Sequence, residues 1–245
     1  MTAAPGARPG SSGPPPALVA AAAHVFVDDL DSPELADDDA HHLGRVLRLR
    51  DGEVVTAGDG AGCWRPCRFA RGRLEIDGDV VAVPAPAATI AVAFAVPKGD
   101  RPELIVQKLT EVGADAIVPM TTARTVVRWD AEKAPRNVER LRRVAREAAM
   151  QSRRVRLPVV EPLAEFGAVV GRPGAVVAAP GGASLPLRGG GPALVLIGPE
   201  GGWSEDELTA APGLVNLGDQ VLRTDTAAIV ACTLLVAARS HSVEV

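Results

Sequence analysis

Hydrophobic and polar residues follow two different patterns along the chain. From about residue 24 to 83, short alternating apolar runs are separated by the turn-forming dipeptides at 51–52, 59–60, 71–72 and 77–78. Apolar residues recur at helical spacing only within 41–49. This part of the chain predicts a small β-barrel, with strands near residues 53–57, 63–69, 73–76 and 79–83.

Beyond a proline-rich linker near residues 84–87, the pattern changes to alternating strands and helices. The segment TIAVAFAV (89–96) is apolar almost throughout, as expected of a strand buried on both faces. Asp100 is a predicted helix cap, with Glu103 completing a capping box and Gly113 ending the helix. Further strands are predicted near 116–120, 155–160, 174–179, 193–197 and 214–217, and further helices at about 135–151 and 226–238. This order indicates an α/β sheet domain.

The predicted helix at 135–151 is amphipathic in an informative way. On a helical wheel its apolar residues fall within one arc, and Arg136, Arg140, Arg143 and Arg146 lie opposite. We therefore expect one face to pack against the domain and the other to be cationic.

The first residues have a composition of their own. Residues 1 to about 22 are mainly Pro, Gly, Ala and Ser, which cannot bury enough apolar surface to become ordered. A disordered tail is the prediction, and a signal peptide is disfavoured because no basic region precedes the short apolar run. No apolar run reaches 18 residues, so no membrane span is expected. The three cysteines, Cys63, Cys67 and Cys232, favour reduced thiols in a cytoplasm.

Charge is distributed unevenly in this 245-residue chain. The formal net charge of −4 argues mildly against a nucleic-acid partner. Residues 28–39 hold seven acids and no base, whereas residues 124–156 hold eleven bases and four acids, and residues 45–73 are also locally basic. Such segregation is compatible with a surface for a polyanion, although basic helices are also often simply solvated.

Two glycine-containing loops follow predicted sheet strands, where open α/β sheets bind ligands. They are GPEGGWS (198–204) and LGDQVLRTDT (217–226). The first lacks the lysine of a phosphate-binding loop, and the acids at 205–207 would repel a phosphate from the following helix. This loop suits a ligand with an adenine-like face and a cationic group beside Glu200. It could equally be a tight turn before a capped helix.

Other chemistries find little support in the sequence. Cys63, Cys67, His41 and His42 could ligate zinc, but the C-x3-C spacing is atypical, and we expect no metal. The nucleophile, zinc-protease and dinucleotide motifs are missing from the sequence. The tryptophans have ordinary interpretations as core residues, although Trp64 and Trp129 lie in basic segments where they could stack on bases.

Six segments in order carry a resemblance to a known family. They are HHLGRVLRLRDGE (41–53), KGDRPELIVQKLTEVGADAIVP (98–119), ARTVVRW (123–129), REAAMQSRR (146–154), LIGPEGGWSEDEL (196–208) and LGDQVLRTDTA (217–227). Together they resemble the RsmE family, SPOUT-class methyltransferases that use S-adenosylmethionine to methylate N3 of one uridine in small-subunit (16S) ribosomal RNA. The chain departs from the family at Ala123, where Glu is frequent, at Val221, where Ile is common, and at Asp225, where Glu is common.

The resemblance implies an architecture and partners. It implies a PUA-like barrel that binds RNA, here residues 23–84, and a SPOUT methyltransferase domain with a trefoil knot, here residues 85–245. It also implies a cytoplasmic homodimer that acts on the small ribosomal subunit, with the active site at the dimer interface. A SPOUT enzyme acting on another RNA, or an RNA-binding protein without catalysis, are the alternatives.

Roles for individual residues follow from the resemblance together with the chemistry. Methylation of the uracil N3 requires loss of its proton and stabilisation of charge on the flanking carbonyl oxygens. Arg124 and Arg223 are candidates for that stabilisation, and Glu200 for cofactor orientation or proton acceptance. The expected cofactor contacts are Ala179, Pro180, Leu196, Ile197, Gly198, Pro199, Glu200, Gly201, Gly202, Leu217, Gly218, Val221, Leu222, Arg223, Thr224, Thr226 and Ala227. The expected RNA contacts are Arg45, Arg48, Arg65, Arg136, Arg140, Arg153 and Arg154.

Overall fold

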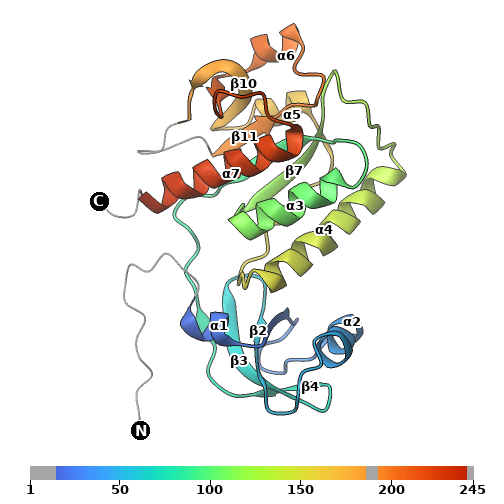
Figure 1. The fold of residues 1–245 in the computed structure, drawn as a ribbon, viewed down its shortest axis with the longest axis vertical. Coiled ribbons are helices and arrows are strands. Elements are labelled where there is room, and N and C mark those ends of the chain that lie inside the picture. The colour runs from blue at the N-terminus through green and yellow to red at the C-terminus, as the bar shows by residue number, and fades with distance from the viewer. Residues whose placement is uncertain (1–14, 186–192, 242–245) are drawn as a thin grey trace. The chain divides into compact units, whose positions relative to one another are not determined.

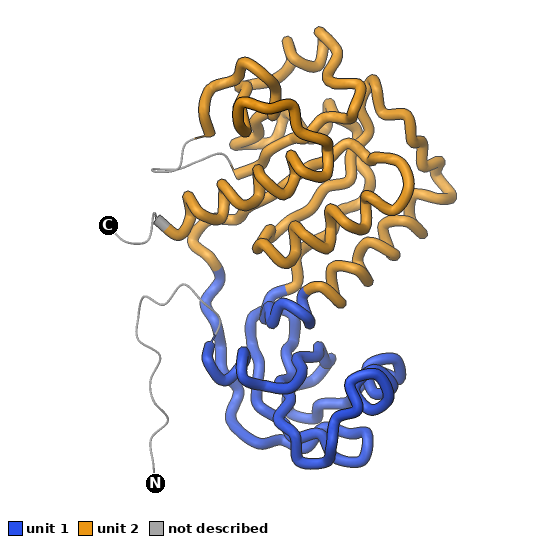
Figure 2. The backbone as a smooth tube through the Cα atoms, viewed as in Figure 1, with its two compact units in different colours: residues 1–85, 149–156 blue, residues 86–148, 157–245 orange. Residues whose placement is uncertain are grey.

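The computed structural model describes residues 15–185 and 193–241, which form two compact units (Figure 2). Unit 1 extends to Ala85 and also includes Ala149–Arg156, and unit 2 comprises Pro86–Ala148 and the chain from Leu157 onward. The predicted division of the chain assigned residues 149–156 to the second domain, whereas their contacts place them with the first unit.

Unit 1 is a small five-stranded sheet with short helical segments. Its elements are α1 (Pro16–Ala20), β1 (Ala23–Phe26), α2 (Asp37–His41), a π-helical turn η1 (His42–Val46), β2 (Val54–Gly58), β3 (Cys63–Ala70), β4 (Arg73–Ile76) and β5 (Val81–Ala82). The strand order is β1-β2-β3-β4, and β5 pairs with β3. The antiparallel β2–β3 and β3–β4 pairs confirm the predicted hairpins, while β1, which runs parallel to β2, was not predicted.

The prediction of a disordered tail over residues 1–22 does not hold for its last residues. Residues 1–14 lie outside the described residues. Residues 16–20, however, form α1, and Leu18 is fully buried. The amide of Ala22 also donates to the carbonyl oxygen of Val54 at 2.8 Å, which joins this segment to β2. The prediction was wrong for these residues because the average composition of a segment does not show whether one of its residues, here Leu18, is buried in the core.

Arginine side chains hold residues 149–156 to the rest of unit 1. Arg153 has a left-handed backbone (φ 61°), and its guanidinium donates to the carbonyl oxygens of Ala21 (2.9 Å) and Ala22 (3.0 Å). Arg156 donates to the carbonyl oxygens of Ala61 and Val83. These bonds connect parts of the chain that are far apart in sequence, which explains why local patterns did not predict them.

Unit 2 is an α/β unit built on a parallel sheet (Figure 1). Its elements are β6 (Ala91–Ala95), α3 (Arg101–Val112), β7 (Ala116–Thr121), α4 (Lys133–Gln151), whose last residues belong to unit 1, β8 (Val159–Val160), β9 (Ala164–Glu165), α5 (Phe166–Val170), β10 (Ala175–Ser184), β11 (Leu194–Ile197), α6 (Glu205–Ala210), β12 (Leu214–Asn216) and α7 (Thr224–His241). The strand order is β12-β10-β11-β6-β7-β8, with β9 also paired to β7 and every pair parallel. The predicted α/β class is confirmed.

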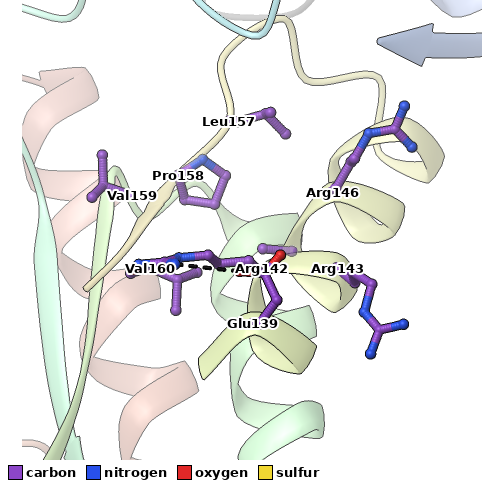
Figure 3. A pocket seen from close by; sticks show the side chains of 9 residues that line it. Glu139, Arg142, Arg143, Arg146, Leu157, Pro158, Val159 and Val160 are labelled. Carbon is purple, nitrogen blue, oxygen red and sulfur yellow. Dashed lines mark hydrogen bonds and ion pairs between the residues drawn. The ribbon is translucent and has the colours of Figure 1, made fainter. Parts of the chain in front are cut away.

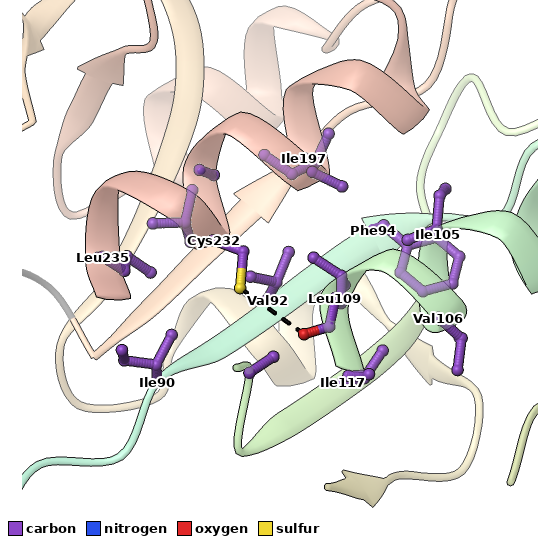
Figure 4. Close-up of a cluster of buried hydrophobic side chains, with 14 of the residues drawn as sticks. Ile90, Val92, Phe94, Ile105, Val106, Leu109, Ile117, Ile197, Cys232 and Leu235 are labelled. Carbon is purple, nitrogen blue, oxygen red and sulfur yellow. Dashed lines mark hydrogen bonds between the residues drawn. The ribbon is translucent and has the colours of Figure 1, made fainter. Parts of the chain in front are cut away.

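Both faces of this sheet are covered, which explains the uninterrupted apolar run in β6. Val92 and Phe94 belong to a core cluster with residues of α3, α4 and α7. Figure 4 shows the part of this cluster where α3 and α7 meet the sheet. Ala93, between Val92 and Phe94, faces the opposite cluster, which includes Phe166 of α5 and Trp203. Successive strand residues point to opposite faces of a sheet. When both faces are covered, every residue of the strand is buried, and polar residues are therefore disfavoured at all of its positions.

The start of α3 differs in detail from the prediction. The helix begins and ends where expected, with Gly113 at φ 121° as its C-cap. Asp100, however, has ψ 11° rather than an extended conformation, and its side chain makes no capping hydrogen bond. Glu103 forms an ion pair with Arg140 of α4 instead. The predicted capping box is therefore wrong, since the Glu103 carboxylate pairs with Arg140 and not with the amide at the start of its own helix.

Among the helices within residues 15–185 and 193–241, none combines the length and the hydropathy of a membrane span. The trefoil knot implied by the resemblance stays a prediction.

Candidate active site

The two loops singled out by the sequence follow neighbouring parts of the parallel sheet. Residues 198–204, the glycine loop, come directly after β11, and residues 217–223 come after β12. Since β10 pairs with both β11 and β12 in parallel, the carboxyl ends of these strands lie at one edge of the sheet. Ligand sites of open α/β sheets are found at this edge.

The glycine loop is a tight turn followed by a capped helix. Gly202 has φ 70°, and its amide donates to the carbonyl oxygen of Pro199 at 2.9 Å. The Ser204 hydroxyl accepts from the amide of Glu207 (3.2 Å), and the Glu207 carboxylate accepts from the amide of Ser204 (2.9 Å). The alternative prediction of a tight turn before a capped helix is therefore confirmed for the backbone. A loop of this conformation can also bind a ligand.

Trp203 anchors this loop to the sheet. Its indole N–H donates to the carbonyl oxygen of Ala178 at 2.9 Å, and its ring packs against Phe166 with centroids 5.4 Å apart. The side chain is buried, which confirms its interpretation as a core residue. A Cβ atom on Gly198 would lie 2.8 Å from Cε2 of this ring, so the first glycine of the loop leaves room for the indole.

Residues 122–125, the arginine turn, form a second loop that contacts the glycine loop. The turn is closed by the amide of Thr122, which donates to the Thr125 hydroxyl at 2.9 Å. Arg124 Nη1 donates to the carbonyl oxygen of Gly201 at 3.0 Å. The predicted catalytic arginine therefore lies against the predicted cofactor loop, although its guanidinium is already engaged there.

Glu207 also connects the two loops, and the sequence interpretation missed this role. Glu207 is only 7% exposed, and its Oε1 accepts from the amide of Ala123 at 2.8 Å. From the sequence, Glu207 is expected only to repel phosphate, as one of the acids at 205–207. The available signal was the Ser-x-x-Glu spacing of a capping box at Ser204.

The remaining predicted catalytic residues differ in their engagement. Glu200 forms an ion pair with Arg101 of α3 at 2.9 Å, and both side chains are partly exposed. Arg223 is exposed, and its guanidinium makes no hydrogen bond or ion pair with the described residues. The Thr224 hydroxyl donates to the carbonyl oxygen of Gly198 at 2.9 Å, which joins the start of α7 to the glycine loop.

The other expected cofactor residues lie around the same edge. Ala179 and Pro180 fall in an irregularity of β10, where the register to Val215 shifts between Ala178 and Ala183. Gly218 has φ 147°, and Val221 is 91% exposed. Leu196 and Ile197 are buried in β11, and Ala227 is buried in α7. Their backbone groups, more than their side chains, are what this edge offers to a ligand.

The expected RNA-contact arginines divide into two groups. Arg45, Arg48 and Arg136 are exposed, and Arg140 is half-exposed in its pair with Glu103. Arg65, in contrast, is buried and donates to the carbonyl oxygens of Leu30 (2.7 Å) and Gly78 (2.8 and 3.0 Å).

Arg65 and Arg153 therefore bind backbone carbonyls within unit 1, which leaves little of either guanidinium for a phosphate. Arg154 is half-buried and is not free of partners.

A hollow of about 360 Å³ lies elsewhere on unit 2 (Figure 3). It is formed by the outer face of α4 and the segment that leads into β8, including Arg143, Pro158 and Val159. Arg142 closes one wall by donating to the carbonyl oxygen of Val160 at 3.2 Å. Because it precedes β8, this hollow is separate from the carboxyl ends of the strands.

Comparisons with known proteins agree on one family. A model described as an RNA methyltransferase domain matches residues 84–236, and a model described as an RNA methyltransferase PUA domain matches residues 35–78. Ribosomal RNA small subunit methyltransferase E of Mycobacterium tuberculosis is 37% identical over 215 residues, covering 79% of this chain and 82% of the relative. The Bacillus subtilis protein of the same name is 29% identical over 237 residues, covering 82% and 88%.

Solved structures give the same result. The crystal structure of a ribosomal RNA small subunit methyltransferase E from Neisseria gonorrhoeae, bound to S-adenosyl methionine, superposes with a TM-score of 0.73 at 26% identity. The match covers 86% of this chain and 94% of that structure.

Proposed function

The chain belongs to the RNA methyltransferase family that includes ribosomal RNA small subunit methyltransferase E, and we propose that it methylates N3 of a uridine in small-subunit (16S) ribosomal RNA, with S-adenosylmethionine as donor. The observation that carries this proposal is the glycine loop, held by Trp203 and Arg124 at the carboxyl edge of the sheet in a chain whose solved relative binds that donor. We assign methyl transfer to residues 85–245 and RNA binding to the barrel at 23–84.

The residues at this edge fit S-adenosylmethionine. Ser204 and Glu207 cap the first turn of α6, which also carries acids at 205–207. The N-terminus of this helix is therefore unsuited to binding an anion such as a phosphate. Glu200 adds a carboxylate within the glycine loop, where one oxygen pairs with Arg101 and the other can accept from a cationic ligand. The backbone of 179–180, 196–202 and 217–227 would hold the donor.

When bound, the donor supplies a methyl group on a positively charged sulfur. The chain itself must hold the uracil in line and stabilise the charge that develops on its carbonyl oxygens. Arg223, exposed and without a described partner, is the better candidate for this stabilisation. Arg124, which donates to Gly201, orients the loop and presents its remaining N–H groups.

RNA binding is assigned to the exposed arginines. Arg45 and Arg48 of unit 1 and Arg136 and Arg140 of α4 can contact phosphates without first breaking bonds to backbone carbonyls. Arg154 remains a further candidate. Arg65 and Arg153 are left out because their guanidinium groups hold unit 1 together.

The family resemblance supports three further elements of the proposal. The protein is a homodimer whose interface completes the active site, the backbone of the second domain forms a trefoil knot, and the enzyme acts on small ribosomal subunits in the cytoplasm. Light scattering of the purified protein tests the first element, since a monomer at micromolar concentration would contradict it.

The decisive experiment is methylation in vitro. Small subunits from a strain lacking N3-methyluridine are incubated with the protein and labelled S-adenosylmethionine, and the RNA is mapped by mass spectrometry. One new methyl group on uridine N3 is expected. A methyl group elsewhere would indicate another target, and no heat of binding with donor in large excess would favour a non-catalytic RNA-binding protein.

A further inference from the structure

The proposed function gives Glu207 no part beyond closing the first turn of α6 against an anion, yet this residue occupies an unusual position. It is an acid in the first turn of α6 that is almost fully buried, whereas its neighbours Glu205 and Asp206 are exposed. Buried carboxylates are rare unless hydrogen bonds satisfy them. Its environment must therefore compensate the charge.

The compensation comes from two different loops. One oxygen accepts the amide of Ser204, at the end of the glycine loop, at 2.9 Å. The other oxygen accepts the amide of Ala123, in the arginine turn, at 2.8 Å. Hydrogen bonds to an ionised acceptor are shorter and stronger than neutral ones. A single side chain thus fixes the distance between two backbone segments that are about 80 residues apart.

A second link runs in parallel with the first. Arg124 follows Ala123 directly, and its guanidinium donates to Gly201 in the glycine loop. A Cβ added to Gly201 would lie 3.4 Å from the Cβ of Arg124, so the glycine allows the arginine turn to lie close to the glycine loop here. The carboxylate and the guanidinium together hold the two loops as one body.

We infer that Glu207 is a positioning residue of the methyl-transfer site, which places Arg124 and the glycine loop at a fixed separation. This inference rests on the proposed function of the loops. Glu207 touches neither donor nor uridine in this assignment, and it acts through the amides of Ala123 and Ser204.

The variant Glu207→Gln tests this role with almost no change in size. A glutamine side chain has one acceptor oxygen, and its NH2 group would face the second amide donor. One loop therefore loses its link while the other keeps it. Glu205→Gln, an exposed acid in the same turn, is the matched control.

The first measurement is amide hydrogen exchange of the unliganded protein. Of the two peptides containing Ala123 and Ser204, the one whose amide loses its acceptor should exchange about tenfold faster or more in Glu207→Gln, since exchange follows local opening. In Glu205→Gln the same peptides should exchange as in the wild type. Unchanged exchange in Glu207→Gln would overturn the inference, whatever the activity of the enzyme.

The second measurement separates positioning from direct catalysis. Glu207→Gln should lower kcat by about tenfold or more because small displacements of catalytic groups are costly. In an Arg124→Ala background the same substitution should change kcat by less than about twofold, since coupled residues are not additive. Full additivity would show that Glu207 does not act through Arg124.

Failure of the proposed function and failure of this inference can be told apart. If the wild type transfers no methyl group, the proposed function fails, while the exchange measurement still tests the link between the loops. If Glu207→Gln does not fold, Glu207→Asp replaces it, because a side chain shorter by one methylene cannot accept from both amides in the present geometry. Faster exchange of the peptide containing Ala123 or of the one containing Ser204 is then expected, and unchanged exchange of both would overturn the inference.

Discussion

Replacing Gly198 by alanine tests how the glycine loop is held in place. A Cβ at this position would lie 2.8 Å from Cε2, 3.0 Å from Nε1 and 3.2 Å from Cζ2 of Trp203. Gly198 is not among the glycines with positive φ, so its backbone can accommodate alanine. The effect therefore isolates the steric conflict with the indole.

The indole has little freedom to move away. It is buried, it donates to Ala178, and it packs against Phe166. Overpacking of this kind costs about 1–3 kcal/mol, and loss of the indole hydrogen bond adds about 0.5–1.5 kcal/mol. We expect Gly198→Ala to lower the free energy of unfolding by about 2–3 kcal/mol. For a chain of this length, the Tm should fall by about 5–10 °C.

The assay combines thermal unfolding with calorimetric titration of S-adenosylmethionine. Because the loop must shift to relieve the clash, donor affinity should fall about tenfold or more, or roughly 1.4 kcal/mol. Gly167→Ala is the matched control, since nothing lies within 4 Å of its added Cβ and it lies in α5. That variant should keep donor affinity and gain about 0.5–1 kcal/mol. A Gly198→Ala protein with unchanged Tm and donor affinity would refute the reasoning.

Five other substitutions test separate parts of the structure. Leu18→Ala should destabilise unit 1 by about 2–5 kcal/mol in urea unfolding, because Leu18 is fully buried. Burial, with a smaller contribution from the charge of Arg153, lowers the pKa of His24 to about 4, so the unfolded chain binds the extra proton between pH 6.5 and 4. Wild-type stability should thus fall by ~2 kcal/mol from pH 7 to 5, and His24→Gln should lose this dependence. Arg223→Ala should lower kcat for RNA methylation by about 100-fold, and unchanged kcat would exclude Arg223 from charge stabilisation. Arg45→Gln should reduce the salt dependence of RNA binding by about one unit of slope, whereas Arg65→Gln should lower the Tm.

Elements with a strong periodic pattern were predicted well. The arc of apolar residues on α4 packs as expected, with Val138, Leu141 and Ala145 in the core cluster. The apolar run of β6 is buried on both faces, and the hairpins of unit 1 form at the predicted turns. In each case the information is local, since the pattern of one segment records which of its faces are buried.

Polar side chains were predicted less well. Arg65 and Arg153 were expected on an RNA surface and instead donate to backbone carbonyls 35 and 132 residues away in sequence. Glu103 was expected to cap its own helix and instead pairs with Arg140. A charged group takes whichever partner the fold brings near, and its own segment does not record that partner.

The sequence determined most strands and the long helices of unit 2, the two loops at the sheet edge and the family, because burial patterns and short motifs are properties of contiguous segments. The joining of those loops by Glu207, the burial of Leu18 and the separation of structural from exposed arginines arose from the folded arrangement. Hydrogen bonds act over about 3 Å, so a residue's partners are known once distant segments have been brought to that range.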